Sequence, residues 1–279
     1  MYKRLSATVT LCFLTSLLPV SAGAAGAASG FLPHRAVYDL ELKEASDRSG
    51  IRGMYGRIVY ELTGSACDGF SSRYRFNTRV QIGGRTLDND QRSSTYESPD
   101  GSRFNFVTQY YLNGQKEQDL RGSATRDASG VSVSLKKPDE RNVSLEPAIF
   151  MNQHLVKIIE AARAGDAVLT ARIYDGTDDG DRLVDTTTII GKEKPGANSR
   201  DGEPEKLSSK FEGKAAWPVS VSYFKTGKVE GGGERTPSYV VSFLLQEDGV
   251  SRDLTMRYDD YAMKGTLKQI EYLEISACD

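Results

Sequence analysis

Side chains suited to acid–base catalysis are scarce in this chain, which has only two histidines, His34 and His154, among 279 residues. A Ser-His-Asp site needs a histidine as its base, so it would have to use one of these two. His154 lies near the apolar side of an amphipathic stretch, where we interpret it as a packed, hydrogen-bonded group. The sequence also lacks a G-x-S-x-G elbow and the H-E-x-x-H and C-x-x-C motifs. We therefore predict a protein that is not an enzyme and carries no cofactor.

Carboxylates are the remaining groups with catalytic potential. A pair that flanks a sugar bond can cleave it, but the sequence singles out no such pair. The most acidic stretch, residues 174–181 (YDGTDDGD), does not match a calcium-binding loop. Counting from Asp175 puts Thr177 at position three and Thr186 at position twelve, where an EF-hand needs oxygen ligands and a glutamate. Because Asp and Gly favour turns, we interpret this stretch as a hairpin turn.

The N-terminus has the three parts of a secretory signal peptide. Lys3 and Arg4 precede an apolar run over residues 5–20, and A-x-A sites follow at residues 22–27. The run is too short for a membrane-spanning helix, and no later run is longer. We predict that residues 1–27 are a signal peptide, that residues 28–279 form one exported domain, and that this domain does not span a membrane.

Two cysteines, Cys67 and Cys278, remain once Cys12 is removed with the signal peptide. Exported proteins fold where disulfides persist, and two cysteines allow one intramolecular pairing. An internal disulfide would close a loop of about 210 residues and bring the first and last segments together. The alternative is two free or intermolecular thiols.

The charge balance excludes one class of partner. The chain has 36 basic and 38 acidic residues, a net charge of −2. Nucleic-acid-binding domains usually carry a basic footprint, so we predict no nucleic-acid partner.

Alternation of apolar and polar residues dominates the mature sequence. In residues 70–82 (FSSRYRFNTRVQI), one face carries Phe, Tyr, Val and Ile while the other carries Arg, Asn and Gln. Similar runs are separated by turn formers such as Asn113-Gly114, a strong hairpin signal. The pattern predicts an all-β protein. Fourteen tyrosines, among them Tyr38, Tyr60, Tyr74, Tyr110, Tyr223 and Tyr239, either suit these strands or line a site for an acyl chain or peptide.

One stretch, residues 146–166, has helical spacing instead. Pro147 suits the first turn and Gly165 suits the C-terminal cap. Its apolar stripe, which we expect to act as a lid or to contact a ligand groove, contains Phe150, His154, Leu155 and Ile158. The Pro- and Gly-rich stretches 193–206 and 226–237 are predicted to be mobile loops.

Several segments, in order, resemble the EipB family of periplasmic cell-envelope integrity proteins. They are LPHRAVYDLEL, HLVKIIEAARAG, IYDG, WPVSVSYF, PSYVVSFLLQEDGVSRDL and YAMKGTLKQIEYLE, the last followed by a cysteine.

This resemblance implies a long antiparallel sheet curled into an open spiral or barrel-like shape, with one main helix packed against it. The shape is similar to that of the lipoprotein carriers LolA and LolB. The resemblance also implies one disulfide from an early loop to the C-terminus, which Cys67 and Cys278 match. It implies a non-catalytic periplasmic protein that binds a protein, lipoprotein or lipid. An envelope-glycan hydrolase with an unrecognised carboxylate pair is the alternative.

Overall fold

The computed structural model describes residues 31–198, 200–226 and 235–275. The predicted signal peptide, most of the loop predicted at 226–237 and Cys278 lie outside them. Besides strands, these residues form one α-helix, α1 (Met151–Ala164), and two 3-10 helices, η1 (Asp47–Ser49) and η2 (Glu205–Phe211). The strands are β1 (His34–Ala45), β2 (Ile51–Ser65), β3 (Gly69–Ile82), β4 (Arg85–Glu97), β5 (Arg103–Leu112), β6 (Gln115–Arg126), β7 (Val131–Lys137), β8 (Arg141–Leu145), β9 (Val168–Ile173), β10 (Val184–Ile190), β11 (Lys194–Pro195), β12 (Ala215–Lys225), β13 (Tyr239–Gln246), β14 (Ser251–Arg257) and β15 (Tyr261–Tyr272).

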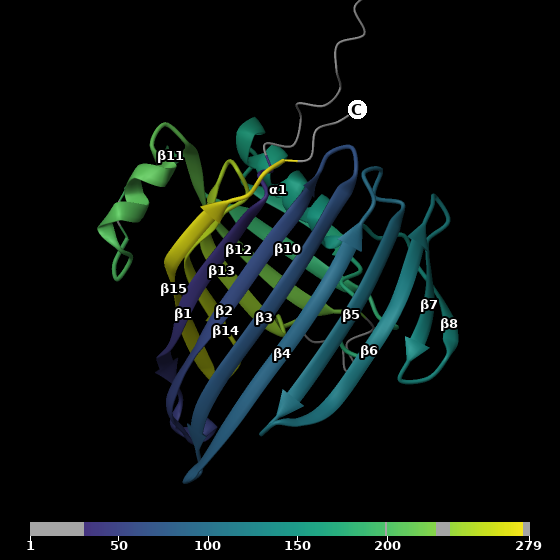
Figure 1. The fold of residues 1–279 in the computed structure, drawn as a ribbon, viewed down its shortest axis with the longest axis horizontal. Helices are drawn as coiled ribbons and strands as arrows, with labels where there is room; N and C mark the ends of the chain where they lie inside the picture. The colour runs from purple at the N-terminus through teal and green to yellow at the C-terminus, as the bar shows by residue number, and fades with distance from the viewer. Residues whose placement is uncertain (1–30, 199, 227–234, 276–279) are drawn as a thin grey trace, which may run out of the picture.

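All the strands belong to one antiparallel sheet that curls around an interior without closing (Figure 1). Its order is β8-β7-β6-β5-β4-β3-β2-β1-β15-β14-β13-β12-β10-β9, and β11 pairs with β12. The edge strands are therefore β8 and β9. The predicted fold, a long antiparallel sheet curled into an open, barrel-like shape with one main helix packed against it, is confirmed.

Strand alternation decides which side chains enter the interior. In β3, Tyr74 and Phe76 point inward and are half-buried, whereas Arg75 between them is exposed. The turn after β5 uses Asn113 and Gly114 at φ 50° and 81°, the left-handed geometry that a tight hairpin requires. The hairpin signals in the sequence thus set the register that keeps one face of the sheet apolar.

The gap between the two sheet edges is bridged by the segment that leads into α1. Ile149 pairs in parallel with Ile173 of β9. The Ile149 N–H donates to the Arg172 carbonyl at 3.0 Å, and the Tyr174 N–H donates to the Ile149 carbonyl at 2.9 Å. The next residue, Phe150, is fully buried and stacks on Phe104 at 5.0 Å between ring centroids. Residues 146–150 are thus extended, which is why the prediction that Pro147 lies in the first helical turn is wrong.

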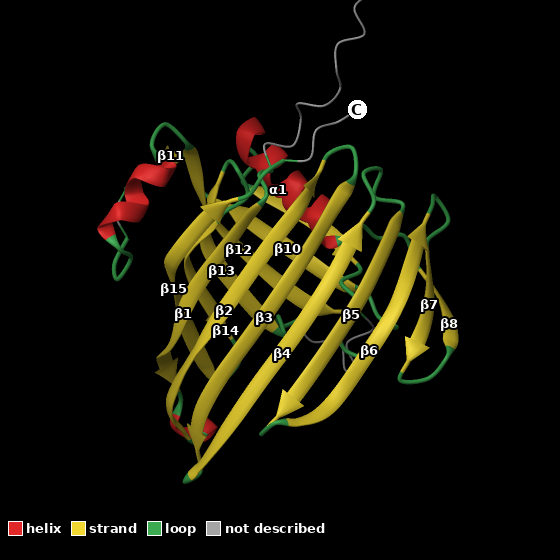
Figure 2. Cartoon of the chain, viewed as in Figure 1, coloured by secondary structure: helices red, strands yellow, loops and turns green. Residues whose placement is uncertain are grey.

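Helix α1 lies inside the curled sheet, between the front strands and those behind (Figure 2). Its buried residues, including Ile158 and Ile159, pack against Leu62 of β2, Trp217 of β12 and Leu245 of β13. The helix ends as predicted, with Gly165 as a left-handed cap at φ 81°. The helix therefore fills one end of the interior.

Residues 193–198 and 200–214 form a lobe on the outer surface beside β15, so the stretch predicted as a mobile loop at 193–206 is anchored to the sheet (Figure 1). The anchor is Arg252 of β14, which is fully buried. Its guanidinium binds the Glu203 carboxylate at 2.5 Å and the carbonyls of Gly196 and Asn198. It also lies 4.4 Å from the ring centroid of Phe211. The Pro- and Gly-rich composition of this stretch does not reveal that Arg252, about fifty residues later in the sequence, anchors it.

The first and last strands lie side by side, as we expected. His34 at the start of β1 pairs with Leu62 of β2 on one side and with Tyr272 of β15 on the other. The Leu273 N–H then donates to the Pro33 carbonyl at 2.9 Å. The end of β2 and the end of β15 therefore leave the sheet at the same rim.

Removal of the Glu203 carboxylate tests the buried pair. We expect Glu203→Ala to lower the free energy of unfolding by about 3 kcal/mol, because the fully buried Arg252 charge loses its counter-charge. The exposed Glu205 nearby provides the control, and Glu205→Ala should change stability by less than about 0.5 kcal/mol. Urea titrations of the three proteins measure the difference. Equal midpoints for all three would contradict the anchoring role of Arg252.

Candidate ligand-binding interior

Part of the interior is lined by large aromatic side chains that are only half-buried. They project from the middle of β3, from the ends of β5, β12, β13 and β15, and from the turn after β14. We call them the aromatic lining: Tyr74, Phe76, Tyr110, Tyr223, Tyr239, Tyr258 and Tyr261. Four of the tyrosines singled out in the sequence are among them. Tyr258 and Tyr261 were not singled out from the sequence, because they lie on either side of a turn, where the alternation typical of a strand is interrupted.

Four tyrosines of the aromatic lining form a continuous stack across three strands. Ring centroids are 4.4 Å apart for Tyr223 and Tyr239, 5.9 Å for Tyr239 and Tyr258, and 4.8 Å for Tyr258 and Tyr261. Their interplanar angles lie between 12° and 27°. Stacked rings make a stiff, flat apolar wall, which suits contact with an acyl chain or another flat apolar group.

The hydroxyl groups of this stack are available for a ligand. Among the described residues, no side chain or carbonyl accepts a hydrogen bond from the hydroxyls of Tyr223, Tyr239, Tyr258 or Tyr261. Burial raises the pKa of Tyr258 to about 12 and also raises those of Tyr223 and Tyr239. These hydroxyls therefore stay protonated at neutral pH and can donate. The wall is amphipathic, with apolar ring faces and a row of polar tips.

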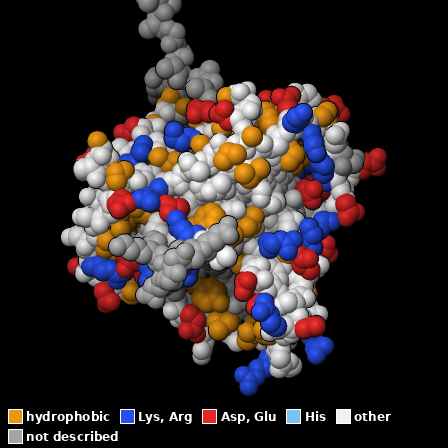
Figure 3. All heavy atoms as spheres, turned by 180° about the vertical axis from the view of Figure 1, so that it is seen from behind, with side chains coloured by type: hydrophobic (Ala, Val, Ile, Leu, Met, Phe, Trp, Pro, Cys, Tyr) orange, Lys and Arg blue, Asp and Glu red, His pale blue; other side chains and the backbone are white. Residues whose placement is uncertain are grey.

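A polar hollow of about 460 Å³ continues the interior beside Tyr110. Gln91, Thr108 and Gln118 line it from β4, β5 and β6, and Lys225 of β12 and the acidic turn at 177–182 complete it. Seen from behind, hydrophobic side chains gather in the middle of the molecule between charged borders (Figure 3). An amphipathic ligand with its apolar part on the aromatic lining would thus meet polar groups at the mouth.

The residues predicted as a helical lid lie in the packed end of the interior. Ile158 is buried and Leu155 is half-buried in the core around Trp217, whereas Phe150 is buried in a separate cluster with Phe104. His154 is buried, and its Nε2 lies 3.2 Å from the Thr186 hydroxyl. Burial lowers the pKa of His154 to about 4, so the ring is neutral at neutral pH. None of these four residues lines the polar hollow; they fix the helix that ends the cavity.

The N-terminus of α1 is capped from a distant strand. Phe150 at the cap position has no side-chain hydrogen bond to offer. Instead the Glu97 carboxylate of β4 accepts the N–H groups of Asn152 at 2.9 Å and Gln153 at 3.1 Å. Two orphan donors of the helix are thereby satisfied, and a negative charge meets the positive end of the helix dipole. Desolvation dominates, however, and raises the pKa of Glu97 to about 7.

The other buried carboxylates are also held by structural partners. Asp248 binds the Lys214 ammonium at 2.5 Å and accepts the Tyr272 hydroxyl at 2.6 Å. The acidic turn is organised by its own side chains, since Asp175 accepts the N–H and the hydroxyl of Thr177 at 3.0 and 2.8 Å. Within the described ranges, no three His, Cys, Asp or Glu side chains come together as a metal site would require.

Cys67 lies in the exposed turn between β2 and β3, where the Ser65 hydroxyl accepts its N–H at 3.3 Å. Its predicted partner, Cys278, lies outside the described residues. The pairing therefore stays a prediction.

A protein-family model described as EipB-like matches residues 25–274 of the chain. The chain belongs to the EipB-like family. A relative within it, the cell envelope integrity protein EipB of Brucella abortus (strain 2308), is 36% identical over 253 residues, which are 90% of this chain and 88% of the relative.

The EipB-like fold is also known from a solved structure. The crystal structure of a beta-barrel-like protein of a domain of unknown function, DUF1849, from Brucella abortus matches with a TM-score of 0.80 and 35% identity. The match covers 88% of this chain and 99% of that one. Among the helices that the structure describes in this EipB-like chain, none has the length and apolar character needed to cross a membrane.

Titration of Glu97 should appear in the pH dependence of stability. Its folded pKa of about 7 lies above the usual 4.5, so its contribution is present below pH 4.5 and is lost as pH rises through 7. His154, with its pKa lowered to about 4, contributes in the opposite sense, because its stability is lost as pH falls below 6.5. Glu97→Gln removes the first effect alone.

We therefore expect the stability of Glu97→Gln, relative to the unmodified protein, to rise by up to about 3 kcal/mol between pH 4.5 and pH 7.5. Urea titrations across this range measure it. Glu160→Gln, on the exposed side of the same helix, is the control and should keep the parent profile. Parallel profiles for Glu97→Gln and its parent would show that Glu97 is not desolvated in the folded state.

Proposed function

We propose that this protein is a non-catalytic periplasmic protein that maintains the integrity of the cell envelope by binding an amphipathic envelope component. The component is a lipid, or a lipoprotein held by its acyl chain, in the interior of the curled sheet. The envelope role rests on the name of the relative, a cell envelope integrity protein. The binding mode rests on the aromatic lining with its unpaired hydroxyls.

The chemistry of the aromatic lining supports an amphipathic ligand over a purely apolar or purely polar one. A cavity for a simple hydrocarbon would be lined by aliphatic side chains, and four phenol groups in it would each lack a hydrogen-bond partner. A cavity for a polar molecule would not need the stacked rings from Tyr223 to Tyr261. A chain with a polar end meets both requirements, because its methylenes cover rings while its polar groups accept hydrogen bonds.

Three observations support binding over the alternative, an envelope-glycan hydrolase. Glu97 is bound to the N-terminus of α1, Glu203 to Arg252, and Asp248 to Lys214 and Tyr272. A retaining or inverting hydrolase needs two carboxylates that face one another across a substrate cleft. Absence of turnover on peptidoglycan or other envelope glycans supports the binding function, whereas turnover would replace it with the alternative.

The location and the disulfide are part of the same proposal. Export through a signal peptide at residues 1–27 delivers the chain to the periplasm, where the Cys67–Cys278 bond forms. Leu62 and Tyr272 lie on either side of His34, so they are about 10 Å apart across two strand spacings. Cys67 follows Leu62 by five residues and Cys278 follows Tyr272 by six, which supports this pairing.

Adjacent tyrosines on β5 provide a matched test of binding. Tyr110 points into the interior and lines the polar hollow, whereas Tyr111 points outward beneath Arg92. We expect Tyr110→Ser to weaken binding of a fluorescent long-chain fatty acid about fivefold, because the ligand loses roughly 40 Å² of apolar contact. Tyr111→Ser should leave the affinity unchanged. Fluorescence titration measures both, and equal affinities for the two variants would argue against the interior as the site.

If Cys67 and Cys278 are joined, removing either cysteine should destabilise the protein as much as removing both. Cys67→Ser and Cys278→Ser should each lower the free energy of unfolding by about 2–5 kcal/mol, and the double variant should be no less stable than either. Thiol labelling of the unfolded exported protein should give no signal before reduction. Additive losses in the double variant, or labelling of Cys67 without reduction, would mean that these two cysteines are not joined to each other.

A further inference from the structure

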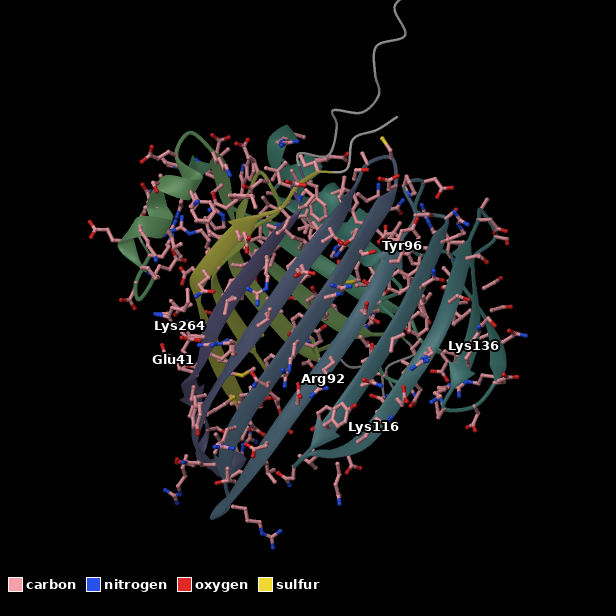
Figure 4. All side chains as sticks on the ribbon, viewed as in Figure 1. Glu41, Arg92, Tyr96, Lys116, Lys136 and Lys264 are labelled. Atoms are coloured by element: carbon pink, nitrogen blue, oxygen red, sulfur yellow. The ribbon has the colours of Figure 1, made fainter. Side chains whose placement is uncertain are left out.

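The outward face of β3–β7 carries an excess of positive charge, although the whole chain has a net charge of −2. Strand alternation directs these side chains away from the interior. Arg92 and Lys136 are seen on this face in Figure 4. We call it the outer basic face and define it by Arg73, Arg75, Arg92, Arg103, Arg121 and Lys136. Three further cations of these strands are paired with carboxylates, Arg79 with Asp88 and both Lys116 and Lys137 with Asp119.

Carboxylates neutralise this face only in part. Asp90 is shared by two guanidiniums, at 2.9 Å from Arg75 and 2.7 Å from Arg92. Glu61 is likewise shared, because it lies 3.1 Å from Arg73 and also contacts Arg35 at 4.0 Å. Each carboxylate thus leaves one positive charge in excess.

The remaining three cations of the outer basic face have no counter-charge. Among the described residues, no carboxylate lies within 4.0 Å of Arg103, Arg121 or Lys136. Arg121 and Lys136 are exposed and lie on the neighbouring strands β6 and β7. Because an isolated arginine or lysine gives little to stability at an exposed position, these charges are free to engage an anion from outside.

The free cations border a hollow with many hydrogen-bonding groups. A depression of about 440 Å³ is lined by Arg121, Lys136, Tyr96 and Asn105, together with Ser71, Ser94 and Ser123. A second depression, of about 350 Å³, shares Ser94 and Val107 with the first and reaches Arg73 and Arg92. The two form one elongated surface that carries hydroxyls, the amides of Asn105 and Gln109 and several cations, with Glu61 as its one carboxylate among the described lining residues.

This composition favours an anionic glycan. Hydroxyl and amide side chains hydrogen-bond to sugar hydroxyls, and arginine binds a carboxylate or phosphate through paired N–H groups. A bilayer surface fits less well, since Tyr55 of β2 is the one large exposed hydrophobic side chain on this face of the described chain, and membrane-bound surfaces insert several.

We propose that the outer basic face is a second binding site, which takes an anionic polysaccharide through its carboxylate or phosphate groups. Arg121 and Lys136 bind the acidic group, and Asn105 with the serines of the larger depression bind the sugar hydroxyls. The site lies on the opposite side of the sheet from the aromatic lining, so it does not depend on the function proposed for the interior.

Binding of fluorescently labelled polygalacturonate, a soluble carboxylated glycan, tests the site. At about 50 mM salt we expect saturable binding that weakens as salt increases, because the contacts are between exposed charges. The double variant Arg121→Gln/Lys136→Gln should bind about tenfold more weakly, since both free cations are removed. Neutral dextran should not compete.

The control variant loses two positive charges at a different place on the surface. Lys206→Gln/Lys210→Gln removes two exposed lysines of η2 and should bind polygalacturonate as the parent does. If both double variants bind polygalacturonate equally weakly, the effect comes from the net charge of the protein and the proposed site is wrong. The proposal is also wrong if the parent protein does not bind polygalacturonate. A last experiment uses vesicles that contain phosphatidylglycerol. If the protein binds these vesicles and soluble polygalacturonate does not displace it, the outer basic face binds a membrane surface instead of a glycan. Fatty-acid binding should be the same in all these proteins, which keeps this result separate from the proposed function.

Discussion

The pairing of β1 with β15 holds the architecture together. Every other ladder in the sheet joins strands from the same half of the chain, either β1–β8 or β9–β15. Among the described strands, only β1 and β15 join the halves within the sheet, through a ladder from His34–Tyr272 to Ala45–Tyr261. Its middle is packed closely: a Cβ on Gly265 would lie 3.0 Å from the Cβ of Leu254 and 3.2 Å from Leu40. A side chain there would force Leu254 and Leu40 to shift by a few tenths of an ångström. A disulfide across the adjacent rim would hold the same junction.

The opposite seam is held by side chains and one short backbone pairing, which explains why the sheet stays open. Ile149 supplies two hydrogen bonds to β9, and Phe150 enters a ring cluster with Phe104, Phe106 and Tyr174. Glu97 then fixes the direction in which α1 enters the interior. In a closed barrel the edge strands β8 and β9 would pair directly, which would leave no gap for the segment that leads into α1. The open seam therefore lets α1 enter the interior, which it shares with the half-buried rings of the aromatic lining.

Local patterns in the sequence predicted the elements but not the contacts between distant ones. The alternation around Tyr74 and the cap at Gly165 depend on neighbouring residues, so the strands and the C-terminal end of the helix were predicted correctly. The roles of Glu97 and Arg252 depend on partners about fifty residues away, and no periodicity encodes them. A signal for Glu97 did exist: it shares the inward parity of Ser93 and Thr95 on β4, and a carboxylate at an inward position must have a partner inside. For Arg252 there was no such signal, because the Pro- and Gly-rich composition of the lobe predicted a mobile loop and not a segment anchored by a buried arginine.

Because successive side chains of a strand point to opposite sides, the two surfaces of the sheet carry different chemical groups. On β5, Tyr110 faces the interior and Tyr111 faces outward, and on β3 the rings of Tyr74 and Phe76 alternate with Arg73 and Arg75. A thin sheet thus presents an apolar wall to one side and cations to the other, with only the backbone between them. A lipid-like ligand inside and an acidic glycan outside would occupy the same strands without competing for a side chain. Under the two proposals, one sheet would hold two components of a cell envelope at a separation set by its thickness.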